Sequence, residues 1–107
     1  MPAKRSSITR IIEAYKDSLL NFGIHVQKVI LFGSHAKGAA HQFSDIDLIV
    51  VSNDFRSMNL RQRLEILGIA AARIMKPIEA KGYTAAELKK ASPVNFLGEA
   101  LSSGVVV

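Results

Sequence analysis

Two aspartates stand at alternate positions where the strongest β-strand pattern of the chain begins: Asp45 and Asp47 lead into the apolar residues 48–51. Because side chains alternate along a strand, the two carboxylates share one face, about 6–7 Å apart at the backbone. At that separation two like charges repel by roughly 2–3 kcal/mol at an effective dielectric constant of about 20. Two interpretations stay open: solvated carboxylates at the edge of a sheet, or ligands of a divalent cation such as Mg²⁺, which prefers carboxylate and phosphate oxygens.

A second short apolar run, residues 29–32, is followed by Gly33 and Ser34 and predicts another buried strand. Glycine at that point lets the backbone approach a phosphate closely, and Ser34 can donate its hydroxyl and its N–H to a phosphate oxygen. Lys37 could add a positive charge. A Gly-Ser pair after a strand is more often a simple turn, so the information lies in its pairing with the two aspartates of the next strand.

Two stretches with apolar residues at helical spacing flank these strands. The first predicts a helix capped by Ser6 or Ser7, with the apolar positions Ile8, Ile11, Ile12, Tyr15, Leu19 and Leu20. The second predicts a helix that ends before Pro77, with the apolar positions Leu60, Leu64, Leu67, Ala71 and Ile74. We interpret the second stripe as core, or as core plus a dimer surface.

The remaining segments predict a third strand, two short helices, and a C-terminal tail that is either an edge strand or a partner contact. Residues 78–83 are long enough for the strand, and Thr84 with Glu87 forms a capping-box pattern at the start of a helix. Residues 92–104 predict the other helix. The chain of 107 residues fits a single domain, 1–107, without internal repeats.

Composition excludes some classes of protein and leaves others open. The chain has no cysteine, so disulfides and thiolate metal sites are excluded, and no apolar run approaches the roughly 20 residues of a membrane helix. We therefore expect a cytoplasmic protein without membrane contact. The net charge of +5 suits a phosphate-bearing partner, but the basic residues are spread along the chain, as on solvated helix faces. A nucleic-acid-binding domain is supported by net charge alone.

The two apolar runs and the segment between them carry a family resemblance. Residues 31–38 (Leu-Phe-Gly-Ser-His-Ala-Lys-Gly) and residues 44–50 (Ser-Asp-Ile-Asp-Leu-Ile-Val) together resemble the signature of minimal nucleotidyltransferases in the DNA polymerase beta superfamily. The resemblance implies an α+β fold, a small mixed β-sheet with helices packed mainly on one side. It also implies transfer of a nucleoside monophosphate from a nucleoside triphosphate to an acceptor, with release of pyrophosphate.

The resemblance assigns roles to single residues. The nucleotide-binding residues would be Gly33, Ser34, Lys37 and Ser44. Asp45 and Asp47 would be catalytic ligands of two Mg²⁺ ions, one that lowers the pKa of the attacking hydroxyl and one that neutralises the leaving phosphates. Active members usually carry a third carboxylate on a later strand, and here the acidic residue near the predicted third strand is Glu79. If that strand lies beside the second, Glu79 could be a catalytic metal ligand or a general base; its other interpretation is an exposed strand residue.

We expect ATP as the nucleotide, AMP as the transferred group, and a protein or small molecule as the acceptor. The resemblance also implies a setting, because stand-alone domains of this size often pair with a small helical partner of the HEPN type in toxin–antitoxin modules. There the nucleotidyltransferase is the antitoxin, which binds or adenylylates the toxin; a homodimer also stays open. The alternative, from a different class, is a catalytically inactive module that keeps the fold and binds nucleotide or a partner protein.

Overall fold

The computed structural model describes residues 5–33, 45–90 and 104–107. Its elements are α1 (Arg5–Leu20), β1 (Lys28–Phe32), β2 (Ile46–Val51), the 3₁₀ helix η1 (Asn53–Ser57), α3 (Leu60–Arg73), β3 (Ile78–Tyr83), α4 (Ala85–Lys89) and β4 (Val105–Val106). The three predicted strands are confirmed to within one residue at each end, and the C-terminal tail forms an edge strand. The helix expected at 92–104 falls almost wholly outside the described residues.

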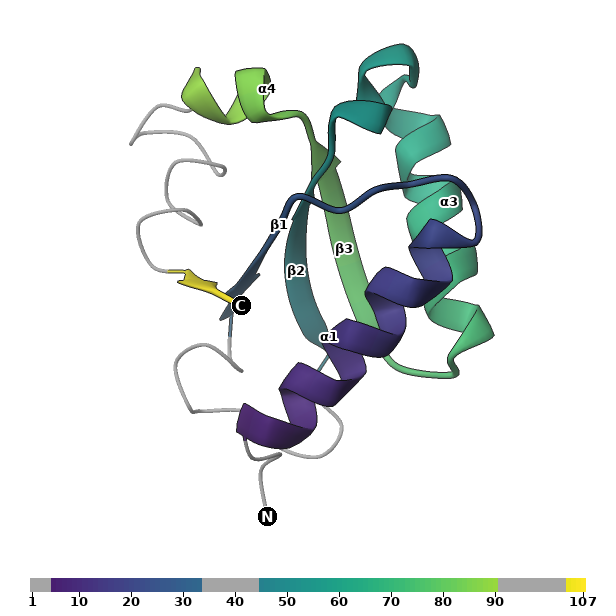
Figure 1. Cartoon of the computed structure of the whole chain (residues 1–107), viewed down its shortest axis with the longest axis vertical. Coiled ribbons are helices and arrows are strands. Elements are labelled where there is room, and N and C mark those ends of the chain that lie inside the picture. The colour runs from purple at the N-terminus through teal and green to yellow at the C-terminus, as the bar shows by residue number, and fades with distance from the viewer. Residues whose placement is uncertain (1–4, 34–44, 91–103) are drawn as a thin grey trace.

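The four strands form one mixed sheet in the order β3-β2-β1-β4 (Figure 1). β1 pairs antiparallel with β2 and with β4, whereas β2 and β3 are parallel. Parallel neighbours require a crossover connection, and α3 lies in that connection. The register places Asp47 opposite Phe32 on β1 and opposite Glu79 on β3. The mixed sheet expected from the sequence is confirmed.

Helices α1 and α3 cover one face of this sheet. Leu48 and Val50 of β2 are fully buried in a core that includes Tyr15 of α1 and Leu67 of α3. Burying an aliphatic side chain of this kind contributes about 1.5–3 kcal/mol. The Tyr15 hydroxyl donates a hydrogen bond to Leu67 O at 2.8 Å and so ties the two helices together. Burial raises the pKa of this hydroxyl far above its ordinary value, which keeps it a donor at neutral pH.

The opposite face of the sheet carries a smaller apolar cluster. Ile30, Ile49 and Val51 are buried there, and α4 packs onto them through Ala85 and Leu88. Two of the three described α-helices therefore share one side of the sheet, and the expected packing of helices mainly on one side is confirmed.

The ends of the helices agree with the sequence in part. The capping box of Thr84 and Glu87 is present at the start of α4, as predicted. α1 already includes Arg5, so the expectation that Ser6 or Ser7 caps it is wrong. Among the helices in the described part of the chain, none is long and apolar enough to span a bilayer.

The predicted apolar stripe of α3 is confirmed at Leu67 and Ala71, which are buried, and is wrong at Leu60 and Leu64. Leu60 and Leu64 are 66% and 56% exposed, whereas Arg63 is only 5% exposed. The guanidinium of Arg63 lies inside because it finds hydrogen-bond acceptors there, and a buried charge is tolerated only with such partners. At the start of α3 the side chain that faces the interior is therefore that of Arg63, and not that of Leu60 or Leu64.

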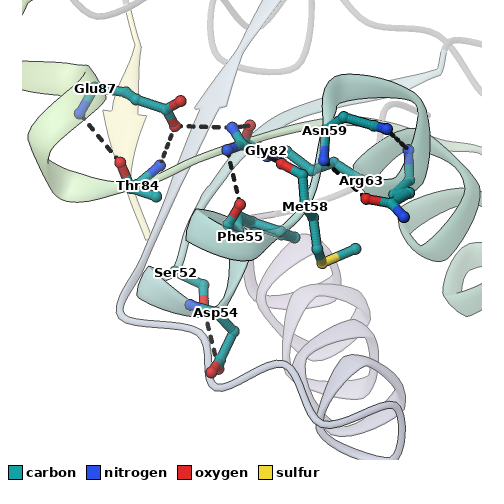
Figure 2. Close-up of polar contacts among 10 residues, drawn as sticks. Ser52, Asp54, Phe55, Met58, Asn59, Arg63, Gly82, Thr84 and Glu87 are labelled. Atoms are coloured by element: carbon teal, nitrogen blue, oxygen red, sulfur yellow. Dashed lines mark hydrogen bonds and ion pairs between the residues drawn. The ribbon is translucent and has the colours of Figure 1, made fainter.

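Arg63 connects the elements that follow β2 (Figure 2). Its Nε donates to Met58 O at 3.1 Å, its Nη1 to Gly82 O at 3.2 Å, and its Nη2 to Phe55 O at 2.8 Å. Nη1 also forms an ion pair with Glu87 Oε1 at 2.8 Å. One side chain thus holds the end of β3 and the start of α4 against η1 and α3.

Candidate functional site

Gly33, directly after β1, adopts the left-handed backbone conformation with φ +74°. A residue with a Cβ loses about 1–2 kcal/mol in that conformation. Space is restricted as well, because a Cβ there would lie 3.1 Å from Asp47 Cγ and would overlap the Asp47 carboxylate oxygen Oδ2. The pairing of Phe32 with Asp47 brings the two together. Glycine is needed here both for its conformation and for its close approach to Asp47.

Asp45 and Asp47 flank Ile46 at the start of β2. Ile46 is 3% exposed in the core on the α1–α3 face, so the alternation of side chains directs Asp47 to the opposite face. Asp47 is partly buried, and Asp45, just before the strand, is exposed. The Ile46 N–H donates to Pro77 O at 2.8 Å, which fixes this end of β2 beside β3. The two aspartates therefore stand at the start of a rigid strand.

Glu79 lies on β3 in register with Asp47. Its neighbours Ile78 and Ala80 belong to the core on the α1–α3 face, which directs Glu79 to the face of Asp47. The condition set by the sequence, that the third strand lie beside the second, is confirmed. Glu79 is exposed, however, and within residues 5–33, 45–90 and 104–107 no three His, Cys, Asp or Glu side chains gather closely enough to hold a metal ion. The role of Glu79 as ligand or base stays a prediction.

The chemistry of these residues fits a hard divalent cation. Asp45, Asp47 and Glu79 all offer carboxylate oxygens, the ligands that Mg²⁺ prefers. The missing side chain of Gly33 lets the Asp47 carboxylate lie against the backbone at the end of β1, where any Cβ would collide with it. These three carboxylates are the described residues that would hold such an ion.

The other predicted nucleotide-binding residues are Ser34, Lys37 and Ser44, which lie outside the described residues. Their roles stay predictions. Gly33 is the one of the four predicted nucleotide-binding residues that lies within the described part of the chain, and it lies against the Asp47 carboxylate.

A cluster of His25, Ser52 and Asp54 escaped the sequence analysis. The Asp54 carboxylate accepts from the His25 N–H at 2.7 Å and lies 3.1 Å from the ring Nδ1. Ser52 Oγ donates to the His25 carbonyl at 2.7 Å, lies 3.3 Å from Asp54 Oδ2 and accepts from the Asp54 N–H at 3.1 Å, which are the contacts of a helix cap. The hydrogen bond from the His25 N–H, followed by that from its ring, holds the pKa of Asp54 below its usual value. The cluster joins the segment before β1 to η1. Within it, only Ser52 had a local sequence signal, because serine is a common N-cap and Ser52 is the N-cap of η1.

Residues 8–96 match the family model of the nucleotidyltransferase domain. No curated protein matches the chain.

Several solved structures resemble the fold. One is a toxin–antitoxin crystallised with AMP-PNP, 27% identical with a TM-score of 0.58, where the match covers 88% of this chain and 70% of that one. A variant of the toxin–antitoxin MntA–HpeT is 27% identical with a TM-score of 0.55, over 92% of this chain and 69% of that one. A protein from Sulfolobus solfataricus, described as a candidate nucleotidyltransferase, is 20% identical with a TM-score of 0.56, over 99% and 89%, and shows the likeness of fold alone.

Proposed function

The chain belongs to the nucleotidyltransferase domain family, and on that premise we propose that it transfers AMP from ATP to an acceptor on a protein or a small molecule. The observation that carries the proposal is the position of Asp47, in contact range of Gly33 and in register with Glu79. Asp45 stands two residues before it at the same end of β2. The proposal is supported because Gly33 and these carboxylates lie at one end of the sheet, where Gly33 would let a phosphate approach and the carboxylates would bind metal.

Each residue has a task in this reaction. Gly33 gives the triphosphate access to the backbone beside Asp47. Asp45 and Asp47 would hold two Mg²⁺ ions, and these ions, when bound, would lower the pKa of the attacking hydroxyl and neutralise the leaving phosphates. Glu79 completes the ligand set or accepts the hydroxyl proton. The acceptor oxygen forms a bond to the α-phosphorus, the bond from that phosphorus to the pyrophosphate oxygen breaks, and the proton passes to the base or to solvent.

A small helical protein of the HEPN type is the proposed partner, with this chain as the antitoxin. Support comes from the 27% identity to chains of two toxin–antitoxin structures, one of them crystallised with AMP-PNP. In this setting the HEPN-type protein is the acceptor of AMP, or it is held by binding alone.

Binding without turnover is the second candidate function. It is favoured by the exposure of Glu79 and by the lack of three gathered metal ligands within the described residues. In that case the chain keeps a nucleotide or a partner protein bound and releases no pyrophosphate.

Labelled ATP separates the two candidates. The chain is incubated with α-³²P-ATP, Mg²⁺ and cell extract, and in parallel with the purified product of any adjacent gene that encodes a small helical protein. Transfer predicts a labelled product that is absent with the Asp45→Asn variant. Binding alone predicts no label above that control, while Mg-ATP still raises the melting temperature of the chain.

A further inference from the structure

The connection from α3 to β3 ends beside the candidate carboxylates. β2 and β3 are parallel and pair from Ile46 and Ile78 onward, so the two strands begin side by side. The Ile46 N–H donates to Pro77 O at 2.8 Å, and Asp45 directly precedes Ile46. Figure 1 shows the connection reaching the lower end of β3, where β2 also begins. Lys76, directly before Pro77, therefore borders the candidate site on its β3 side.

Hydrogen bonds on both sides hold the backbone of this connection. The Met75 N–H donates to Ala72 O at 3.1 Å and the Lys76 N–H to Ala71 O at 3.4 Å, the pattern that ends many helices. Lys76 O accepts from the Ile78 N–H at 2.9 Å. Met75 has φ +55°, a conformation that favours glycine. Strained backbone of this kind persists where the surrounding contacts hold it, and it is concentrated at functional sites.

Lys76 brings a positive charge to an end of the sheet where the candidate ligands are negative. It is exposed, and within residues 5–33, 45–90 and 104–107 it takes part in no ion pair. Three carboxylates and a triphosphate together carry more negative charge than two Mg²⁺ ions neutralise, so a further cation beside them favours binding of the nucleotide. The flexible four-carbon stem of lysine lets its ammonium reach a ligand that lies over the neighbouring strand.

The order of the strands indicates which phosphate Lys76 can reach. The sheet runs β3-β2-β1, with Glu79 on β3, Asp47 on β2 and Gly33 directly after β1. In the proposed function the leaving phosphates lie beside Gly33 and the acceptor hydroxyl lies beside Glu79. The attacking and leaving oxygens stand roughly in line across the transferred phosphorus. The α-phosphate is therefore nearer to β3, and to Lys76, than the two leaving phosphates are.

We propose that Lys76 binds the α-phosphate of the nucleotide, an inference that rests on the proposed function. Its ammonium donates hydrogen bonds to the non-bridging oxygens of that phosphate and stabilises their charge. Lys76 forms no covalent bond and takes no proton from the acceptor. Its role is to bind and orient the phosphoryl group that is transferred.

Isothermal titration calorimetry with two ligands tests the proposal. Mg-ATP contains the α-phosphate, whereas Mg-pyrophosphate corresponds to the two leaving phosphates alone. Lys76→Ala should weaken Mg-ATP binding at least about tenfold, because a hydrogen bond to a charged group is lost. The same variant should bind Mg-pyrophosphate as tightly as the unchanged chain does. Lys76→Arg should keep the Mg-ATP affinity within about threefold, because arginine retains the charge and the donors.

Lys28→Ala is the matched control, because Lys28 is an exposed lysine that begins β1 opposite Val51, at the other end of the sheet. It removes the same charge and should leave both affinities unchanged, and circular dichroism should show that all variants are folded.

The outcomes separate this inference from the proposed function. If Asp45→Asn abolishes Mg-ATP binding while Lys76→Ala keeps it, the inference alone is overturned. Equal losses in Lys76→Ala and Lys28→Ala, or an equal loss of pyrophosphate binding in Lys76→Ala, would overturn it as well. No binding of Mg-ATP by the unchanged chain would reject the proposed function and this inference together.

Discussion

Two glycines at positive φ allow backbone conformation to be separated from crowding at single residues. Gly23, after α1, has φ +83° and no atom within 4 Å of the place where a Cβ would be, whereas Gly33 has φ +74° and faces the Asp47 carboxylate. Alanine should lower the unfolding free energy at either position by about 1–2 kcal/mol through conformation alone. At Gly33 the added methyl group must also displace Asp47.

Gly33→Ala should therefore be more destabilising than Gly23→Ala and should also abolish Mg-ATP binding, which Gly23→Ala should keep. Urea denaturation measures the first effect and isothermal titration calorimetry the second. Equal losses of stability with intact nucleotide binding in both variants would contradict a role for the close approach of Gly33 to Asp47.

Asp47→Asn should lower AMP transfer at least about 100-fold, because changing a residue that merely orients a metal ligand already costs about 10–100-fold. The variant should stay folded, because Asp47 lies outside both apolar clusters of the sheet. Initial rates at saturating Mg-ATP measure the first effect. Asp17→Asn, an exposed carboxylate on α1, is the control and should keep full activity. A parallel loss of activity and stability would point to a structural role for Asp47.

Among the elements, those after β2 depend on Arg63, which bonds to η1, β3 and α4. Replacing it with methionine removes a donor from Gly82 O and from Phe55 O, which keeps the Met58 N–H at 3.0 Å, and it leaves Glu87 without its partner. An unsatisfied buried group costs about 1–3 kcal/mol. Arg63→Met should lower the unfolding free energy by about 3 kcal/mol. Arg63→Lys should not restore it, because a single ammonium cannot replace a planar fork of donors.

The control for this prediction is Arg61→Met, which removes an arginine whose side chain is 88% exposed and pairs with Glu65 across one turn. Such surface pairs contribute about 0.3–0.5 kcal/mol. Urea denaturation of all three variants compares the effects, and similar losses for Arg61→Met and Arg63→Met would show that the buried network adds no stability.

The start of α4 should respond to pH through Glu87. Burial raises the pKa of this carboxyl, but hydrogen bonds from Arg63 and from the Thr84 N–H outweigh it and leave the pKa below the ordinary value of 4.5. Because this pKa is lower in the folded chain than in the unfolded chain, ionised Glu87 stabilises the fold at pH values above the unfolded pKa of 4.5. The stabilisation is lost as the pH falls below 4.5 and passes the lower pKa of the folded chain. The side chain is 42% exposed, so the effect is small.

Glu87→Gln should accordingly be slightly less stable than the unchanged chain at neutral pH, and the difference should vanish in strong acid. Urea midpoints across the acidic range measure it. A difference that stays constant down to low pH would show that Glu87 acts through its cap geometry and not through its charge.

Local signals account for the elements that the sequence predicted well. The strands follow from apolar runs, and α4 follows from the Thr84–Glu87 capping box. On α3 the helical spacing predicted the burial of Leu67 and Ala71. The burial of Arg63 could not be predicted, because it depends on carbonyls of Phe55 and Gly82 that only the folded chain brings near. The position of Glu79 relative to Asp47 could not be predicted either. The sequence places Glu79 on a strand but does not fix how that strand pairs, and it is the parallel register of β2 and β3 that puts Glu79 opposite Asp47.

In the molecule as a whole, the larger core and the candidate site lie on opposite faces of the sheet. One face buries the core under α1 and α3, and the other face carries the candidate carboxylates at the start of β2 and β3. Asp45 and Glu79 are exposed and Asp47 is partly buried, so none of the three belongs to the core. Their substitution should therefore change ligand binding with little effect on the packing that holds the fold.

The position of the candidate carboxylates outside the core leads to a prediction of how Mg-ATP changes the unfolding free energy of the whole molecule. A ligand that binds only the folded state at 100 times its dissociation constant adds about 2.7 kcal/mol to the unfolding free energy. The unchanged chain should gain about that amount from Mg-ATP, and chelation of the metal should remove most of the gain. The variant with Asp45→Asn and Asp47→Asn should not respond to Mg-ATP, because it lacks the carboxylates that would hold the metal.

Thermal unfolding of both proteins, with ATP alone, with Mg²⁺ alone and with the two together, distinguishes the possible sites. An equal gain in both proteins would place the nucleotide on the basic surface, where attraction of the triphosphate by the net charge of +5 needs no carboxylate. That attraction should fade with added salt, because screening between exposed charges shortens to about 3 Å at 1 M. A gain confined to the unchanged chain, dependent on Mg²⁺ and persisting in salt, is what a carboxylate–metal–phosphate site requires.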